Sequence, residues 1–206
     1  GGLPALEGIL FASIDMAKGQ DHFRLFGISV SPDNTKVAFG VDTVSRRQYT
    51  IKVKDLKGGL IMDTEIKNTT GGSVWASDNL TLFYNKKDEQ TLRSEAVYKH
   101  KINRPHQDDV LVYEEVDEAY SVYVNSSKSR KYIFVSCHNT KTSEHHFIQA
   151  SQPESDFQLI QARTSGLEYD VEHFGDHFYI HTNFNKAKNF QIMRTPVDRT
   201  TTDHWQ

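Results

Sequence analysis

The 206-residue sequence has a single cysteine, Cys137, so an internal disulfide is excluded. Cys137 follows Tyr-Ile-Phe-Val-Ser and keeps the alternating phase of Ile133 and Val135. This pattern predicts a buried, small apolar side chain rather than a reactive thiol. The sequence also has only 5 prolines and no low-complexity tract, while Phe, Tyr and Trp are plentiful. This composition argues against disorder and favours pleated, half-buried surfaces.

The sequence lacks a basic excess and long apolar runs. Its net charge of -3 and its isoelectric point near 6.4 give no electrostatic case for a nucleic-acid or anionic-membrane partner. No apolar run approaches the ~20 residues that span a bilayer. Gly1-Gly2 stands where an initiator Met would be, which suggests an internal start or residues introduced by cloning. We expect a cytoplasmic location, or a periplasmic one if a signal peptide precedes these residues.

Catalytic signatures are missing as well. No Gly-x-Ser-x-Gly nucleophile elbow occurs, since the stretch 71–75 fails at its last position, and no glycine-rich phosphate loop is present. The acidic run 113–118 falls in the connection between two predicted blades and is interpreted as a solvated turn rather than as a cation site or an acid/base pair. We therefore predict no catalytic residue and no cofactor within these residues.

The sequence has 10 histidines, which raise the question of a metal site. His173, His177 and His181 have the i, i+4 spacing of a helical zinc site, but a Gly-Asp turn between them favours a hairpin. On a strand His177 and His181 would lie about 13 Å apart. His145 and His146 are adjacent and would point to opposite faces. We therefore predict no metal site.

What the sequence does contain is a repeat. In residues 71–86 an apolar segment runs into an Ala-Ser-Asp-Asn turn, and an alternating segment follows, which is typical of a β-hairpin. Similar units occupy residues 28–39, 122–135 and 169–180. The equivalent positions Val37, Leu82, Tyr132 and Phe178 are 45, 50 and 46 residues apart. A four-stranded propeller blade occupies about 40 to 50 residues, so the chain is predicted to consist of consecutive blades.

The predicted fold is therefore all-β, a partial β-propeller with about four blades of four-stranded antiparallel sheet. Residues 1–8 stand outside it, and residues 9–206 form the partial propeller domain. Residues 9–14 are predicted to be the outer strand of a preceding blade, and the last blade is expected to lack its fourth strand. Both end blades should expose apolar surface. Alternatively, the strand at 9–14 closes a four-bladed ring by filling that empty outer position. The predicted blades cover residues 26–66, 71–115, 119–163 and 167–206.

Two adjacent arginines, Arg46 and Arg47, fall between the second and third predicted strands of the first blade. They are either part of a solvent-exposed turn or a pair of guanidinium groups that bind carboxylates at a domain interface, since arginine offers bidentate geometry. The residue chemistry alone leaves both interpretations open.

Several segments carry a more specific likeness. Residues 44–49, 73–84, 111–122 and 166–180, in this order and spacing, resemble the N-terminal propeller of the prolyl oligopeptidase family, and are most similar to the oligopeptidase B (protease II) branch. The resemblance covers about residues 9–206. It implies a seven-bladed propeller that caps an α/β-hydrolase domain and admits only short peptides to an enclosed serine peptidase site.

In the oligopeptidase B branch, cleavage follows Arg or Lys. The nucleophile motif of the hydrolase domain does not occur in these 206 residues. The resemblance thus implies a substrate-gating part of a serine-type oligopeptidase, inactive alone, whose partners are the hydrolase domain of the same parent chain and short peptides. It adds weight to an interdomain role for Arg46 and Arg47. A stand-alone propeller that serves as an interaction scaffold or ligand sensor is the alternative.

Overall fold

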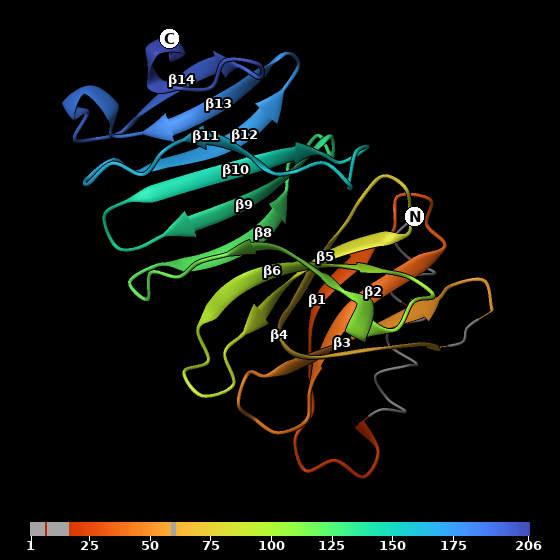
Figure 1. Cartoon of the computed structure of the whole chain (residues 1–206). Helices are drawn as coiled ribbons and strands as arrows, with labels where there is room; N and C mark the ends of the chain where they lie inside the picture. The colour runs from red at the N-terminus through yellow and green to blue at the C-terminus, as the bar shows by residue number, and fades with distance from the viewer. Residues whose placement is uncertain (1–6, 8–16, 59–60) are drawn as a thin grey trace. The chain divides into compact units, whose positions relative to one another are not determined.

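The computed structural model describes residue 7 and residues 17–58 and 61–206. The chain divides into two compact units, Gly1–Glu114 and Glu115–Gln206. In residues 24–58 and 61–206 the regular elements are antiparallel strands and three one-turn 3-10 helices, whereas the described residues Glu7 and Ala17 are α-helical (Figure 1). The all-β prediction is confirmed. The predicted outer strand at 9–14 lies outside the described residues, so both that strand and the ring closure built on it stay predictions.

The first unit is one antiparallel sheet in which the strands pair in chain order, β1 to β7. On β3 the buried residues Tyr49, Ile51 and Val53 alternate with the half-buried Thr50 and Lys52, which agrees with the period-2 pattern of the sequence. A single 3-10 turn, η1 (His106–Asp108), precedes the last strand. The strands are β1 (Arg24–Val30), β2 (Lys36–Asp42), β3 (Tyr49–Asp55), β4 (Ile61–Trp75), β5 (Thr81–Lys87), β6 (Ser94–Lys101) and β7 (Val110–Glu114).

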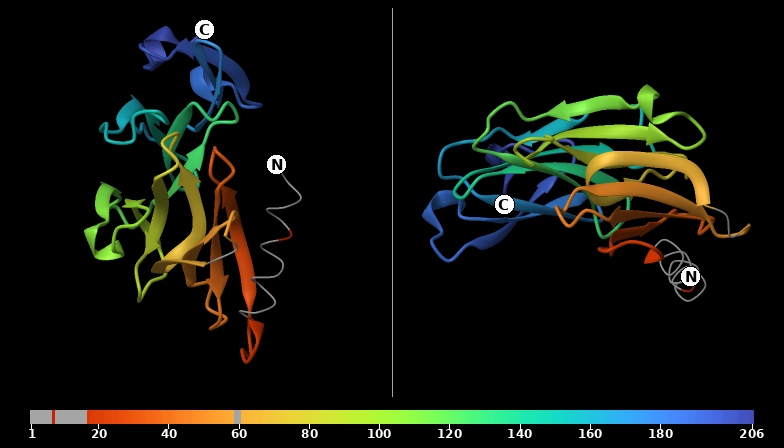
Figure 2. Two further views of the ribbon diagram at one scale, coloured as in Figure 1. Left: turned by 90° about the vertical axis from the view of Figure 1, so that its right-hand side faces the viewer. Right: turned by 90° about the horizontal axis from the view of Figure 1, so that it is seen from below.

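One strand differs from the sequence prediction. The sequence predicts two separate strands here, the fourth strand of the first blade at 59–63 and the first strand of the second blade at 71–75. In the structure, residues 61–75 form one continuous strand, β4 (Figure 2). Its first part pairs with β3 and its last part with β5, and Thr69 pairs with both strands. The segment 64–70 contains no proline, so the strand continues through it, although the pairing with β3 and with β5 has register shifts. Asn68 and Gly71, with φ of 60° and 88°, let the strand bend instead.

Glycines allow β4 to lie directly against the backbone of β1 and β2. A Cβ atom on Gly40 would stand 2.6 Å from the Cα of Gly71, and one on Gly27 would stand 2.3 Å from the carbonyl oxygen of Gly71. No side chain fits in that space. The three glycines therefore set the packing of the first predicted blade on the second.

The core of the first unit combines residues from both predicted blades. Trp75 of β4 lies in this core, and its indole N–H donates to the carbonyl of Ser29 on β1 at 2.9 Å. That bond satisfies the polar atom of a large buried side chain. The cluster consists of Ala38, Ile51, Val53, Ile66, Trp75, Leu82, Tyr84 and Ile102.

The second unit has two sheets with a core between them. The four-stranded sheet has the order β11-β10-β9-β8 and the three-stranded sheet the order β12-β13-β14. Phe178 is at the centre of the core, with the rings of Tyr132 and Phe147 edge-on to it at 5.0 Å. The strands are β8 (Ser121–Ser126), β9 (Tyr132–His138), β10 (Ser143–Gln149), β11 (Gln158–Gln161), β12 (Tyr169–Phe174), β13 (His177–Thr182) and β14 (Gln191–Pro196), and the 3-10 turns η2 (Phe184–Lys186) and η3 (Thr202–His204) flank β14.

The last sheet has three strands among the described residues, as expected for a blade without its fourth strand. Gln206 nevertheless exchanges both backbone hydrogen bonds with Arg194 of β14, at 2.9 and 3.0 Å. This is the pairing of an antiparallel strand on the free edge of β14. Phe174 and Ile192 of this sheet are 75% and 73% exposed, and Phe26 and Ile28 of β1 are also exposed. Apolar side chains are therefore exposed on the first and on the last of the predicted blades.

The repeat seen in the sequence is also a structural repeat. In the turns after β1, β4 and β8, the fourth residue after the end of the strand has a positive φ. These residues are Asn34, Asn79 and Arg130. In each turn this residue donates its backbone N–H to the carbonyl three residues earlier. Asparagine tolerates this conformation better than most residues, which explains the Asp-Asn pairs of the first two turns.

In the part of the chain that the structure describes, no helix is long and apolar enough to cross a membrane.

Candidate domain-contact surface

The predicted arginine pair lies at the tip of the loop that joins β2 to β3. Both side chains are exposed, as either interpretation of the sequence requires. The loop is shaped by Asp42, the last residue of β2, whose side chain is 1% exposed. Its carboxylate accepts the backbone N–H groups of Val44, Ser45 and Arg47 at 3.0 to 3.1 Å. Because these three bonds fix the backbone, the loop presents Arg46 and Arg47 in a defined position.

A third cation joins the pair. Lys87, the last residue of β5, donates from Nζ to the backbone carbonyl of Arg47 at 2.9 Å. Burial lowers the pKa of Lys87 and the charge of Arg47 lowers it further, while Asp42 acts in the opposite direction. The contact connects the β2–β3 loop with the end of β5 and so brings two predicted blades together at one end of the sheet. We call Arg46, Arg47 and Lys87 the cationic tip.

Apolar side chains border the cationic tip. Val44 on the β2–β3 loop is 58% exposed, and Leu92 on the β5–β6 loop is also exposed. The β5–β6 loop is ordered by Asp88, whose carboxylate accepts the N–H groups of Gln90 and Thr91 at 2.9 and 2.7 Å. Cations with neighbouring exposed apolar groups form the kind of mixed surface found at interfaces between domains of one chain.

The second unit holds a charged cluster that sequence reasoning missed. Glu115 was expected in a solvated turn, but it is 4% exposed and accepts two bonds from the Arg163 guanidinium, at 2.6 and 3.3 Å. The expectation of a solvated turn is therefore wrong for this residue. Arg163 also donates to Glu144 at 3.3 Å, and its guanidinium lies 3.9 Å from the centre of the Tyr120 ring. Glu115 and Arg163 are 48 residues apart in the chain, so no local sequence pattern indicates that they pair.

The histidines behave largely as predicted. His173 on β12 and His177 and His181 on β13 belong to a hairpin, and the cross-strand register pairs none of them with another histidine. His145 binds Ser136 and Tyr169, whereas its neighbour His146 binds Glu144, so the two rings point to opposite faces. A group of one Cys, one Glu and one His gathers in the second unit.

A buried Tyr-Asp-His group lies in the first unit. The hydroxyl of Tyr84 donates to Asp109 at 2.6 Å, and Nδ1 of His100 donates to the other carboxylate oxygen at 2.6 Å. The second ring nitrogen, Nε2, is buried and has no hydrogen-bond partner among the residues that the structure describes. A catalytic triad would place a nucleophilic hydroxyl or thiol at that nitrogen. The arrangement is therefore a structural polar group within a core.

The comparisons with known proteins decide the family. A family model described as "Prolyl oligopeptidase, N-terminal beta-propeller domain" matches residues 10–206. The chain belongs to the prolyl oligopeptidase family. Within that family it corresponds to the N-terminal propeller domain, which agrees with the antiparallel sheets described above.

Named relatives support this assignment. Dipeptidyl aminopeptidase BI of Pseudoxanthomonas mexicana is 35% identical over 200 residues, which cover 97% of this chain and 28% of the relative. Protease 2 of Moraxella lacunata is 30% identical over 196 residues, which cover 94% of this chain and 28% of the relative. The chain thus spans somewhat more than a quarter of the length of these prolyl oligopeptidase relatives.

A solved structure gives the same picture. Oligopeptidase B from Leishmania major superposes with a TM-score of 0.87 at 26% identity, over 93% of this chain and 27% of that one. The resemblance to the prolyl oligopeptidase propeller, with oligopeptidase B and protease 2 among the similar proteins, is therefore confirmed.

Proposed function

We propose that these residues are a substrate-gating part of the propeller of a serine-type oligopeptidase that cleaves short peptides after Arg or Lys. The family match over residues 10–206 carries this proposal. The specificity for basic residues is supported by the likeness to Protease 2 and to oligopeptidase B. The 206 residues contain no nucleophile elbow, so the chemistry would belong to a hydrolase domain of the same parent chain.

The role of the propeller in this proposal is steric. A propeller with a narrow passage, together with a movable contact to the hydrolase, excludes folded proteins before any chemistry begins. The partners are the hydrolase domain and short peptides. Taken alone, these residues should show no peptidase activity. We infer a cytoplasmic location for the parent protein, a periplasmic one being the alternative.

We infer further that the cationic tip binds carboxylates of the hydrolase domain. The carboxylate of Asp42, which orders the loop that carries the tip, is already bonded to three backbone N–H groups of that loop. The contact of Lys87 with the backbone carbonyl of Arg47 brings three cationic side chains together at this point. An arginine side chain can hold an external carboxylate with two parallel hydrogen bonds.

The first experiment tests the peptidase assignment. The protein made from the uninterrupted native gene would be treated with a fluorophosphonate, and its intact mass read before and after. A covalent adduct on a product far heavier than 23.6 kDa is the expected result. A product near this mass that takes no label would contradict the proposal and favour the stand-alone interaction scaffold. Reporter peptides ending in Arg, Lys or Pro then test the specificity.

A second experiment tests the cationic tip in the active parent protein. The double variant Arg46→Glu, Arg47→Glu should change the ratio of kcat/KM values for a long and a short substrate by about tenfold, which corresponds to about 1.4 kcal/mol at the domain contact. Arg104→Glu is the matched control, because Arg104 is an exposed arginine that follows β6, at the opposite end of the same sheet. Equal ratios in the double variant and the control would remove the tip from the interface.

A further inference from the structure

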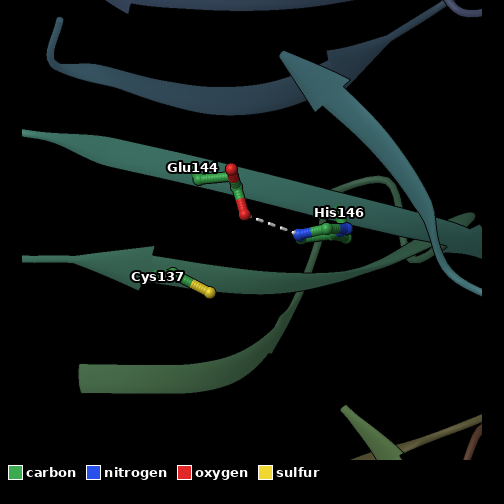
Figure 3. Close-up of side chains that lie close together, drawn as sticks. All are labelled: Cys137, Glu144 and His146. Carbon is green, nitrogen blue, oxygen red and sulfur yellow. Dashed lines mark hydrogen bonds and ion pairs between the residues drawn. The ribbon is translucent and has the colours of Figure 1, made fainter. Parts of the chain in front are cut away.

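Three different metal-ligating side chains gather on one face of the four-stranded sheet in the second unit. The register of β9 and β10 places Cys137 directly opposite Glu144, and His146 follows two residues later on β10, on the same face (Figure 3). Their ligand atoms, Sγ, a carboxylate oxygen and a ring nitrogen, all lie within 4.8 Å of one another. Cys137 is 0% exposed, and the other two side chains are largely buried.

The carboxylate of this group is held in place by hydrogen bonds. One carboxylate oxygen accepts from the Arg163 backbone N–H at 2.8 Å, and the other lies 3.1 Å from Nε2 of His146. Such an outer contact is what orients a ligating carboxylate in metal proteins.

The charges around the group also allow a cation. Arg163 is shared between Glu144 and Glu115, so one guanidinium faces two carboxylates and one negative charge remains. If the thiol of Cys137 released its proton to solvent and a divalent ion bound, the thiolate, the two carboxylates, the guanidinium and the ion would together carry no net charge. Arg163 is therefore compatible with a bound divalent ion.

We propose that Cys137, Glu144 and His146 form a binding site for a single divalent ion of the zinc class. A thiolate, an imidazole and a carboxylate are the ligand types of zinc, with bond lengths of about 2.0 to 2.3 Å. Tetrahedral geometry with these lengths separates ligand atoms by about 3.5 Å. The three ligand atoms lie within 4.8 Å of one another, so side-chain movements of about 1 Å bring them to the separation that a bound ion requires. Three protein ligands leave the fourth position to water.

The rival explanation is a plain hydrogen bond between Glu144 and His146 with a buried thiol nearby. The two explanations differ in whether the sulfur bonds to the ion, and the sequence makes this easy to observe. Because Cys137 is the single cysteine among the 206 residues, a thiolate-to-cobalt charge-transfer band reports on this residue alone.

The test is a Co²⁺ titration of the 206-residue chain, followed by absorption spectroscopy. We expect a charge-transfer band that saturates at one ion per chain, disappears on addition of Zn²⁺, and is absent from Cys137→Ser. Loss of an outer-shell partner typically weakens metal binding about 10- to 100-fold, so His146→Gln, which removes a ligand, should weaken it by more than about 100-fold. His181→Gln, on an exposed position of β13, should bind like the unmodified chain.

A second readout protects the test against misfolded variants. Zn²⁺ should raise the thermal midpoint of the unmodified chain and of His181→Gln, but not that of Cys137→Ser, with circular dichroism used to show that each variant is folded. No charge-transfer band at saturating Co²⁺ in the folded, reduced chain would overturn the proposal. A band of equal affinity in His146→Gln would also overturn it, because the ion would then be held by other groups.

Discussion

The clearest test of how the cationic tip is built is the substitution Asp42→Ala. The Asp42 carboxylate is almost fully buried and accepts three backbone N–H groups of the β2–β3 loop at 3.0 to 3.1 Å. Alanine removes both carboxylate oxygens and with them all three hydrogen bonds. The loop should lose its fixed conformation, and with it the defined position of Arg46 and Arg47.

The size of the effect follows from these bonds. A hydrogen bond to a charged group contributes about 1.5–3 kcal/mol when it is protected from water. Val44, Ser45 and Arg47 are exposed, so water can replace part of what is lost. We therefore expect a decrease of about 2–4 kcal/mol in the free energy of unfolding, below the simple sum of three bonds.

The assay is urea unfolding, together with amide hydrogen exchange of the β2–β3 loop. With a slope of about 2 kcal/mol per molar urea, in the middle of the usual range, the expected loss lowers the midpoint by about 1–2 M. Asp55→Ala is the matched control, since Asp55 also caps a turn but accepts only the N–H groups of Lys57 and Gly58, at 2.9 and 3.4 Å. The reasoning is refuted if the two variants unfold within about 0.5 kcal/mol of each other, or if the amides of Val44 and Arg47 keep their protection.

Two further predictions concern the cores of the two units. His145 is buried as the neutral ring, and burial is the main cause that lowers its pKa to about 4. As the pH falls, the unfolded state therefore binds the extra proton first. The free energy of unfolding should fall by up to about 3 kcal/mol as the pH drops from 6.5 to 4. Urea unfolding at pH 6.5 and at pH 4 should show this loss in the unmodified chain and a smaller loss in His145→Gln. An equal loss of unfolding free energy in the two proteins would contradict the prediction. Gly40→Ala should cost about 1–3 kcal/mol in thermal or urea unfolding, because its Cβ would stand 2.6 Å from the Cα of Gly71. Gly72→Ala is the control, since its Cβ would meet nothing within 4 Å, and a Gly40 variant as stable as this control would disprove the close packing of β4.

The sequence by itself determined the local structure. Alternating apolar residues and Asp-Asn turns recur at blade-like spacing, and both features act between residues that are near one another in the chain. The strands β2, β3, β5, β9 and β13 accordingly appear close to the predicted positions, and Cys137 is buried in phase with Val135. The exposure of Arg46 and Arg47 on a connecting loop belongs to the same class of local inference.

The tertiary structure decided what depends on contacts between distant residues. The continuity of β4 follows from Thr69 pairing with two strands at once, and the close packing at Gly40 and Gly71 requires β2 and β4 to touch. Glu115 is buried because Arg163, 48 residues later, binds it. The Cys137, Glu144 and His146 group depends on the register of one strand pair, and a slip of one residue would send these side chains to opposite faces. Composition and spacing do not encode that register, so only the folded chain shows the site.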